Sequence, residues 1–425
     1  MSARRRRNAW SAGLIALALL AVDRPAALAD QEAQAPHAGM HHDQPSPGWQ
    51  FMQDGAVFLM FNNQGGPRGE TEIKAPNWWM GMASRKAGRG QLTLNLMLSL
   101  DPATVGAQGY SEIFQVGETY NGDPLIDHQH PHDFLMQASA VYRLPLTKGV
   151  RLTLAGAPVG EPALGPVAYM HRLSSYENPI APLSHHTLDS THVAMEVFTA
   201  SIDRGPIQVE GSAFRGAEPD EQRWDLMDPG AIDSWSARVW YRPSPSWSFQ
   251  VSRGFLNEPE ASEEGDVRRT TASGSWTRVR DTGWTAVTAA WGQNQKLGGD
   301  YNAFLLEATH AFGRQLTIFG RLEHNQVETD VLRFGVHLAQ GGRKKAHVVL
   351  PGTIDYVSAL TLGGSRTFWT PRSWDFAAGG DVAAYGVPSV LEPTHGAHPV
   401  SFHLYFRVRI PSSHRMTEMT MTNPT

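Results

Sequence analysis

Residues 91–100 read Gln-Leu-Thr-Leu-Asn-Leu-Met-Leu-Ser-Leu, with leucine at every second position. Successive side chains of a β-strand point to opposite faces of the sheet, so these leucines would all lie on one face. Residues 400–410 alternate in the same way, with apolar side chains set against serine, histidine, tyrosine and arginine. Alternation over about ten residues, with one apolar and one polar face, is typical of a strand in a membrane β-barrel.

The connections between such segments alternate between short and long. The short connections are expected at 86–90, 146–149, 204–205, 243–245, 280–283 and 312–314. The long ones are expected at 65–74, 101–133, 158–190, 216–232 and 257–267. Outer-membrane barrels have tight periplasmic turns at one end and long outer loops at the other. We therefore predict an all-β fold, an antiparallel transmembrane β-barrel of about 16 strands (roughly 14 to 18), over residues 49–410.

The composition narrows the function before any motif is considered. Of 425 residues, 18% are charged, the net charge is −5, and none is cysteine. A modest negative charge provides no basic face, so no nucleic-acid partner is expected. Without cysteine, a metal site would have to use histidine, methionine or carboxylates. After the first thirty residues no apolar run approaches the roughly 20 residues of a membrane helix, so a membrane role would require strands.

The amino terminus has the pattern of a secretory signal peptide. A basic segment at 4–7 precedes an apolar core at 12–22, and small residues surround Leu28. We expect a signal peptide over 1–29, cleaved near Ala29, and export to the cell outer membrane, where the barrel would contact lipid.

The two ends of the mature chain would carry a separate supply of soft ligands. A leader at 30–48 is predicted to be disordered, and a tail at 411–425 follows the last strand. Imidazoles mixed with thioethers suit copper, particularly copper(I). They occur here at His37, Met40, His41, His42, His414, Met416, Met419 and Met421.

The sharpest local motif is Asp-His-Gln-His-Pro-His-Asp at 127–133. In an extended chain His128, His130 and His132 would project to the same side, and Pro131 favours extended geometry before it. Three imidazoles flanked by carboxylates are typical ligands of zinc or copper(II). We predict that they lie at the outer rim of the barrel. The alternative is a solvated loop in which the imidazoles only hydrogen-bond to neighbouring loops.

The next long loop repeats this chemistry and should rise beside the first. It contains three histidines, a fourth follows at position 192, and an aspartate could orient an imidazole through its second nitrogen. We predict copper or zinc as the cofactor and no organic cofactor. The candidate ligands are His128, His130, His132, Asp133, His171, His185, His186 and His192, with Asp127 and Asp189 as supporting acceptors.

These motifs together resemble a family of uncharacterised bacterial exported proteins. The segments that carry the resemblance are 77–82, 127–133, 160–166, 185–192 and 218–224. Members of that family look like outer-membrane β-barrels, and some have histidine- and methionine-rich ends and occur near copper-resistance genes. The resemblance implies an outer-membrane location and a link to copper, and it implies no activity. The present tail departs from the strongest copper pattern, because it is methionine-rich with a single histidine.

We therefore predict a channel-like or porin-like barrel whose histidine-rich rim binds copper or zinc in envelope metal homeostasis, without catalysis. One alternative is a general porin or structural barrel whose histidines only organise loops. Another is an outer-membrane hydrolase, because Ser184, Ser190 and Asp189 lie among histidines, although no G-x-S-x-G motif is present. The sequence leaves open the transported species, the direction of transport, the oligomeric state, and whether an inward-folded 101–133 loop plugs the pore.

Overall fold

The computed structural model describes residues 48–261, 265–297, 299–334 and 353–410. The predicted signal peptide, the leader up to residue 47 and the tail at 411–425 lie outside these ranges. The proposed copper ligands in the leader and tail lie outside them too, so these assignments stay predictions.

Most of the described residues lie in strands. The first half contains β1 (Gln50–Asn63), β2 (Thr71–Lys74), β3 (Asn77–Ala87), β4 (Gly90–Leu98), β5 (Tyr110–Tyr120), β6 (Asp123–Gln129), β7 (Leu135–Thr147), β8 (Val150–Gly160), β9 (Ala194–Arg204) and β10 (Ile207–Arg215). The second half contains β11 (Ser234–Ser244), β12 (Trp247–Leu256), β13 (Val267–Arg280), β14 (Gly283–Lys296), β15 (Gly299–Phe312), β16 (Leu316–Glu328), β17 (Ile354–Trp369), β18 (Asp375–Gly386) and β19 (Val400–Arg409).

Helices are short and lie in the connections. The α-helices are α1 (Asp101–Thr104), α2 (His185–Leu188), α3 (Thr329–Phe334) and α4 (Glu392–His395). The 3-10 helices are η1 (Tyr169–His171), η2 (Leu173–Ser175), η3 (Ser190–His192) and η4 (Pro371–Ser373). Within the described ranges, no helix has the length and apolarity needed to cross a bilayer.

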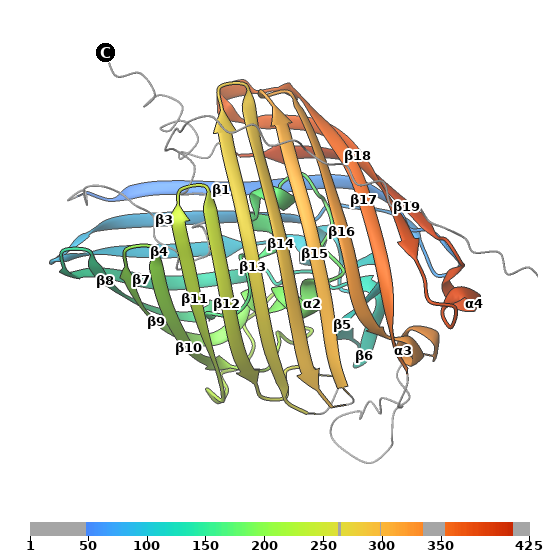
Figure 1. The fold of residues 1–425 in the computed structure, drawn as a ribbon, viewed down its shortest axis with the longest axis horizontal. Helices are drawn as coiled ribbons and strands as arrows, with labels where there is room; N and C mark the ends of the chain where they lie inside the picture. The colour runs from blue at the N-terminus through green and yellow to red at the C-terminus, as the bar shows by residue number, and fades with distance from the viewer. Residues whose placement is uncertain (1–47, 262–264, 298, 335–352, 411–425) are drawn as a thin grey trace, which may run out of the picture.

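The strands close into one antiparallel barrel. Sixteen strands form the wall, and the short β2 joins the same sheet beside β1. The first and last strands pair with each other, with Val57 opposite Val408 and Met60 opposite Tyr405. This pairing leaves the wall without a free edge, which removes the hazard of unpaired strand edges. The predicted fold class is confirmed (Figure 1).

The wall is inverted relative to a soluble protein, with apolar side chains outside and polar side chains inside. In β4, Leu94 and Leu96 are 42% and 40% exposed, whereas Asn95 is buried. In β19, Leu404 is 58% exposed and His403 is fully buried. The alternation that predicted these strands is therefore the alternation between the outer surface and the lumen.

The predicted short connections are tight turns between adjacent strands. The turns that join β7 to β8 and β9 to β10 contain Gly149 at φ 82° and Gly205 at φ 58°. Both angles lie in the left-handed region that glycine adopts at no steric cost and that tight hairpin turns require.

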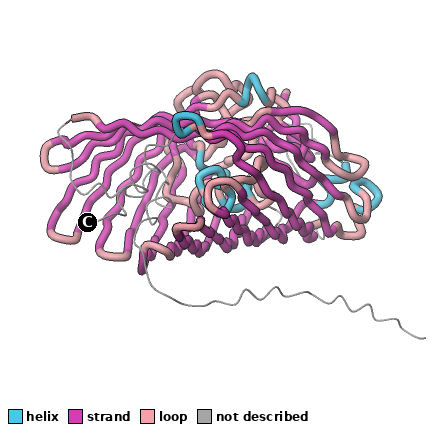
Figure 2. The backbone as a smooth tube through the Cα atoms, turned by 90° about the horizontal axis from the view of Figure 1, so that it is seen from above, coloured by secondary structure: helices cyan, strands magenta, loops and turns pink. Residues whose placement is uncertain are grey.

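The two longest predicted loops do not stand at an outer rim, and this part of the prediction is wrong. Residues 161–193 are all buried or half-buried, and β5 is almost entirely buried. These segments contact inward-facing side chains around the wall: Glu177 accepts hydrogen bonds from Ser365, and its backbone carbonyl accepts one from Tyr405. The loops fold into the lumen because the inward face of the barrel is polar and offers them partners (Figure 2).

Ion pairs between the loops and the wall hold this internal segment in place. Arg172 donates to Glu307 of β15 over 2.6 Å and to Asp189 of its own loop over 2.5 Å. Arg321 of β16 donates to the backbone carbonyls of Ile180 and Ala181. Arg172, Glu307 and Asp189 are each at most 3% exposed, so the charge of each depends on its partner for compensation.

We expect Arg172→Ala to loosen the 161–193 segment while the wall stays closed. Removing one partner of a buried pair leaves uncompensated charge, at a cost of about 3–5 kcal/mol. The expected results are a higher single-channel conductance in planar bilayers and new protease cleavage between residues 161 and 193. The control is Arg268→Ala, because Arg268 is exposed on the outer face of β13. Equal conductance and equal protease resistance for both variants would contradict this role of Arg172.

Candidate metal centre

Five imidazoles from the two inward-folded loops meet inside the barrel. The first loop contributes His130 and His132, which follow β6, and the second contributes two residues of α2 and one of η3. The ring centroids are 6.3 Å apart for His130–His132, 6.0 Å for His130–His185, 5.3 Å for His130–His186, 5.5 Å for His132–His192, 5.2 Å for His185–His186 and 5.3 Å for His185–His192.

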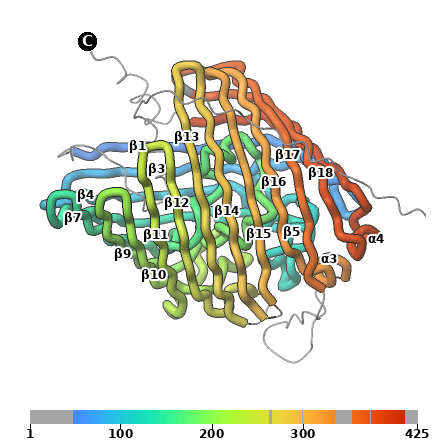
Figure 3. Tube along the Cα trace, viewed as in Figure 1, coloured from blue at the N-terminus to red at the C-terminus, as the bar shows by residue number. Residues whose placement is uncertain are grey.

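Local backbone structure sets the positions of the second-loop histidines. A single turn of helix places His185 and Asp189 four residues apart, so that they lie on the same side and make a 2.7 Å hydrogen bond. The hydroxyl of Ser184 does not cap this helix but donates to Glu323 of the wall. The turn is thereby fixed to the barrel. Figure 3 shows the chain trace of the internal loops, in green, behind strands β14 to β16.

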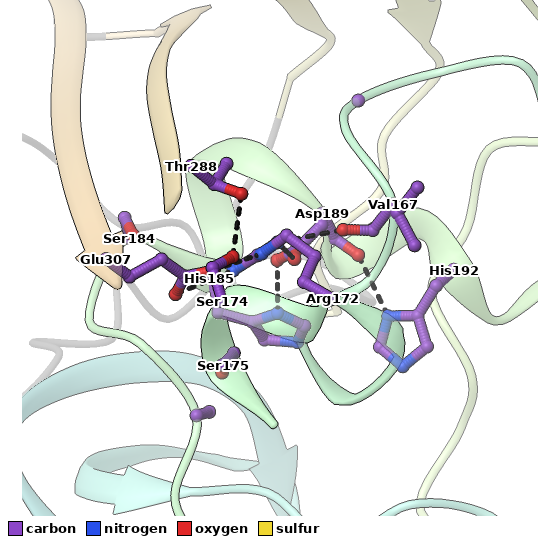
Figure 4. Close-up of polar contacts among 12 residues, drawn as sticks. Val167, Arg172, Ser174, Ser175, Ser184, His185, Asp189, His192, Thr288 and Glu307 are labelled. Carbon is purple, nitrogen blue, oxygen red and sulfur yellow. Dashed lines mark hydrogen bonds and ion pairs between the residues drawn. The ribbon is translucent and has the colours of Figure 1, made fainter. Parts of the chain in front are cut away.

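Four of the imidazoles are each held through Nδ1. His185 bonds the Asp189 carboxylate, and His192 bonds the Asp189 backbone carbonyl over 2.8 Å. Figure 4 shows these two rings on either side of Asp189. His132 bonds a carboxylate oxygen of Asp101 over 2.9 Å. His130 lies 3.2 Å from the Pro131 carbonyl and 3.1 Å from a carboxylate oxygen of Glu118. We call these four residues the inner histidine cluster.

The second nitrogen of each ring has no protein partner. Nε2 of His130, His132, His185 and His192 is buried and makes no hydrogen bond. An unsatisfied buried polar atom costs about 1–3 kcal/mol. The four atoms lie on neighbouring rings, so a single bound group could pair with several of them, as native proteins pair nearly all buried polar groups.

Burial also keeps three of these rings neutral. It lowers the pKa of His130, His185 and His192, and neighbouring imidazoles lower it further for His130 and His192. Asp189 opposes the shift for His185. A neutral imidazole whose Nδ1–H is donated has its lone pair on Nε2, the form that coordinates metals.

The fifth imidazole lies against two carboxylates. Ligand atoms of His186, Glu218 and Glu260 all lie within 4.8 Å of one another. These residues come from the β8–β9, β10–β11 and β12–β13 connections. Burial raises the pKa of both glutamates, and for Glu218 the neighbouring Glu260 carboxylate adds to the rise.

The remaining predicted ligands lie in other surroundings. His128 is not on the same side as the other two imidazoles of its motif: its Nδ1 bonds the Ile126 carbonyl and its Nε2 lies 4.0 Å from Glu70. The strand ends at Gln129, so the two-residue period does not extend through the motif. His171 packs edge-on against Trp78, with a centroid distance of 4.7 Å.

The two predicted aspartates of the motif are engaged in ion pairs. Asp127 pairs with Arg68 at 2.5 Å and with His395 at 3.1 Å. Asp133 and Glu118 share Arg223, which reaches them from the β10–β11 connection. Neither aspartate contacts a ring of the inner histidine cluster in any hydrogen bond found among the described residues.

Sequence reasoning missed several residues that matter here. Asp101 lies 31 positions before His132, and no local pattern links the two. Glu218 and Glu260 lie in separate loops that only the barrel brings together. The segment 218–224 carries part of the family resemblance, and its acidic residues are the one signal in the sequence that points to Glu218.

The serines that suggested a hydrolase are not placed for nucleophilic catalysis. The Ser184 hydroxyl donates to Glu323, and the Ser190 hydroxyl accepts from Arg269. His185 bonds Asp189, but its other nitrogen has no hydroxyl partner. This is not the serine–imidazole contact that a triad requires.

Comparison with known proteins supports the fold and nothing finer. No known protein family and no curated protein matches the sequence. Among solved structures, an anion-selective porin from Comamonas acidovorans is similar with a TM-score of 0.50 and 10% identity, over 85% of this chain and 100% of that one. OprB of Pseudomonas putida, in a high-pH structure, has a TM-score of 0.49 and 9% identity over 85% and 94%. The chain therefore has the fold of a sixteen-stranded porin-type barrel.

We expect the stability of the metal-free protein to depend on pH through its buried imidazoles, of which His186 is the clearest case. The pKa of His186 is lowered by burial and by His185, whereas the unfolded ring keeps its ordinary value of 6.5. Below that value the unfolded chain binds the additional proton, so stability falls with falling pH, by at most about 1.4 kcal/mol per pH unit for this ring.

The measurement is the melting temperature in detergent with a chelator, between pH 7.5 and 5.5. His186→Gln is the variant of choice, because neither ring nitrogen of His186 has a hydrogen-bond partner to lose. Wild type should lose more stability than His186→Gln over this interval. Parallel pH curves would show that the ring is not kept neutral by the fold.

Proposed function

We propose that the protein is an outer-membrane barrel that binds copper(II) or zinc in its lumen through the inner histidine cluster, as part of envelope metal homeostasis. Support for the membrane location comes from the outer surface of the wall. Apolar side chains there are 45–60% exposed: Val239, Val251, Leu306, Leu360, Leu362, Leu404 and Phe406. A soluble protein rarely leaves so large an apolar surface in water, whereas a bilayer covers it.

One observation carries the metal assignment. The four rings of the inner histidine cluster are all bonded through Nδ1, and all four Nε2 atoms are buried without a partner. Metal-bound histidines have this arrangement, because a carboxylate or carbonyl on the second nitrogen fixes the ring and its tautomer. A bound cation would remove the cost of four unsatisfied nitrogens at once.

The spacing and the ligand type favour zinc or copper(II). Two imidazoles on one ion, with metal–nitrogen distances of about 2.0 Å and a tetrahedral angle, have ring centroids roughly 5 Å apart. Neighbouring rings in the cluster are 5.3–6.3 Å apart, so modest side-chain rotation would close a site. Neutral imidazoles suit zinc and copper(II), whereas magnesium and calcium prefer oxygen ligands.

The alternative is a barrel in which the histidines only organise the loops. The Nδ1 bonds to Asp101 and Asp189 would serve that purpose. They leave the Nε2 atoms unexplained, because a purely structural ring gains from pairing both nitrogens. The two readings differ in whether metal affinity or only stability depends on these rings.

Calorimetric titration of the refolded protein with copper(II) and with zinc tests the proposal. The variant His132→Ala/His185→Ala removes two rings of the cluster from two different loops. We expect wild type to bind an equivalent tighter than about 1 μM, roughly −8 kcal/mol, that this variant loses. Electron paramagnetic resonance spectra of the wild-type protein loaded with copper(II) should show coupling to imidazole nitrogen.

The matched control is His128→Ala, which removes an imidazole from the same motif but outside the cluster. Its titration should equal that of wild type. Equal losses in both variants, or no saturable binding by a folded wild-type protein, would overturn the proposal and leave the histidines as loop architecture. Heat-modifiable migration in gels verifies that each variant contains a folded barrel.

A further inference from the structure

Three loops from neighbouring strands meet at the edge of the inner histidine cluster. They contribute His186, Glu218 and Glu260, whose ligand atoms lie within 4.8 Å of one another, and all three residues are half-buried. The inner histidine cluster is less accessible, with His185 fully buried and His192 at 9% exposure. Because it contains two carboxylates, the group of His186, Glu218 and Glu260 also differs chemically from the all-imidazole cluster beside it.

The wall fixes the backbone of His186, whereas the nitrogens of its ring have no hydrogen-bond partner. Its backbone carbonyl accepts hydrogen bonds from Arg269 of β13 at 2.8 Å and from Asn294 of β14 at 3.0 Å. Both ring nitrogens are buried and have no partner. A ring that is held by its backbone and has two unpaired nitrogens is available as a ligand.

A glycine in the first loop makes the space for this ring. A Cβ added at Gly117 would overlap Cε1 of His186 and would lie 2.5 Å from each ring nitrogen. Real Cβ atoms do not approach so closely, so only glycine at this position lets the ring sit between β5 and the wall.

The two glutamates are also held in position. The backbone N–H of Glu218 donates to the carbonyl of Pro259 over 3.0 Å, which ties the β10–β11 connection to the β12–β13 connection next to Glu260. Oε2 of Glu218 is buried and has no hydrogen-bond partner. Two loops are thus joined at the point where each supplies a carboxylate.

The cations nearest to these carboxylates are engaged with other groups. Arg269 donates to Asn294, Ser190 and the His186 carbonyl. Lys296 pairs with Glu328 at 2.7 Å. Both cations also act electrostatically on Glu260, and Arg269 acts on Glu218. The imidazole and the two carboxyl groups, within 4.8 Å of one another, still provide three ligands for a further cation.

We propose that His186, Glu218 and Glu260 form a second metal site, one that takes a divalent transition-metal cation through one imidazole and two carboxylates. The ligand set suits zinc, because the imidazole disfavours magnesium and calcium and the carboxylates disfavour copper(I). The site adjoins the inner histidine cluster, with the His186 ring 5.3 Å from His130 and 5.2 Å from His185. It extends the proposed function but does not depend on it, because it shares no residue with that cluster.

Zinc titration in the His132→Ala/His185→Ala background isolates the second site, since that background has lost two of the four rings of the inner histidine cluster. We expect one equivalent of zinc to remain there, and Glu218→Gln added to the same background should weaken its binding at least tenfold. Asp220→Asn is the control, because it removes the same charge from an exposed position in the same loop. It should leave the remaining equivalent unchanged.

Gly117→Ala provides a test that alters no charge. The added methyl group should displace the His186 ring and weaken zinc binding in this background, while the melting temperature verifies that the protein is folded. A background variant that is folded but binds no zinc, or equal effects of Glu218→Gln and Asp220→Asn, would overturn the second site. If wild type binds one equivalent of zinc and the background variant binds none, only the second site is overturned. The proposal for the inner histidine cluster then still stands, so the two proposals fail separately.

Discussion

Compensation of buried charge inside a closed wall is the constraint on which the structure depends. Closing sixteen strands turns one face of the sheet toward a confined polar interior, where charges cannot be left to bulk water. Arg172 meets this constraint by binding a wall glutamate and a loop aspartate at the same time. The loops are consequently held inside the barrel by the groups that the wall itself must neutralise.

The same compensation positions the imidazoles. Asp189 accepts hydrogen bonds from Arg172 and from His185, and its backbone carbonyl accepts one from His192. Asp189 therefore joins Arg172, which is paired with the wall, to two rings of the inner histidine cluster. The contacts that hold the loop against the wall are therefore also the contacts that position the rings. A change at Arg172 would shift His185 and His192 through Asp189.

Local patterns predicted the wall well, and the candidate residues only in part. Leu94 and Leu404 lie on outward faces because a strand alternates with a period of two, a property that the sequence contains directly. The clustering of His130 and His132 with the α2 histidines followed from the pairing of sequential strands. His128 did not join them, because the strand that carries the motif ends at Gln129, and no residue type marks that end.

By itself, the sequence determined the closed antiparallel wall, the tight turns and the presence of imidazoles in two neighbouring loops. These features depend on the alternation of side chains and on turn residues such as Gly149, which act over a few positions. Only the tertiary structure decided that the loops fold inward and that Asp101, Glu218 and Glu260 lie beside the rings. Those contacts join residues far apart in the chain, and they form because barrel closure brings distant polar groups into one confined interior.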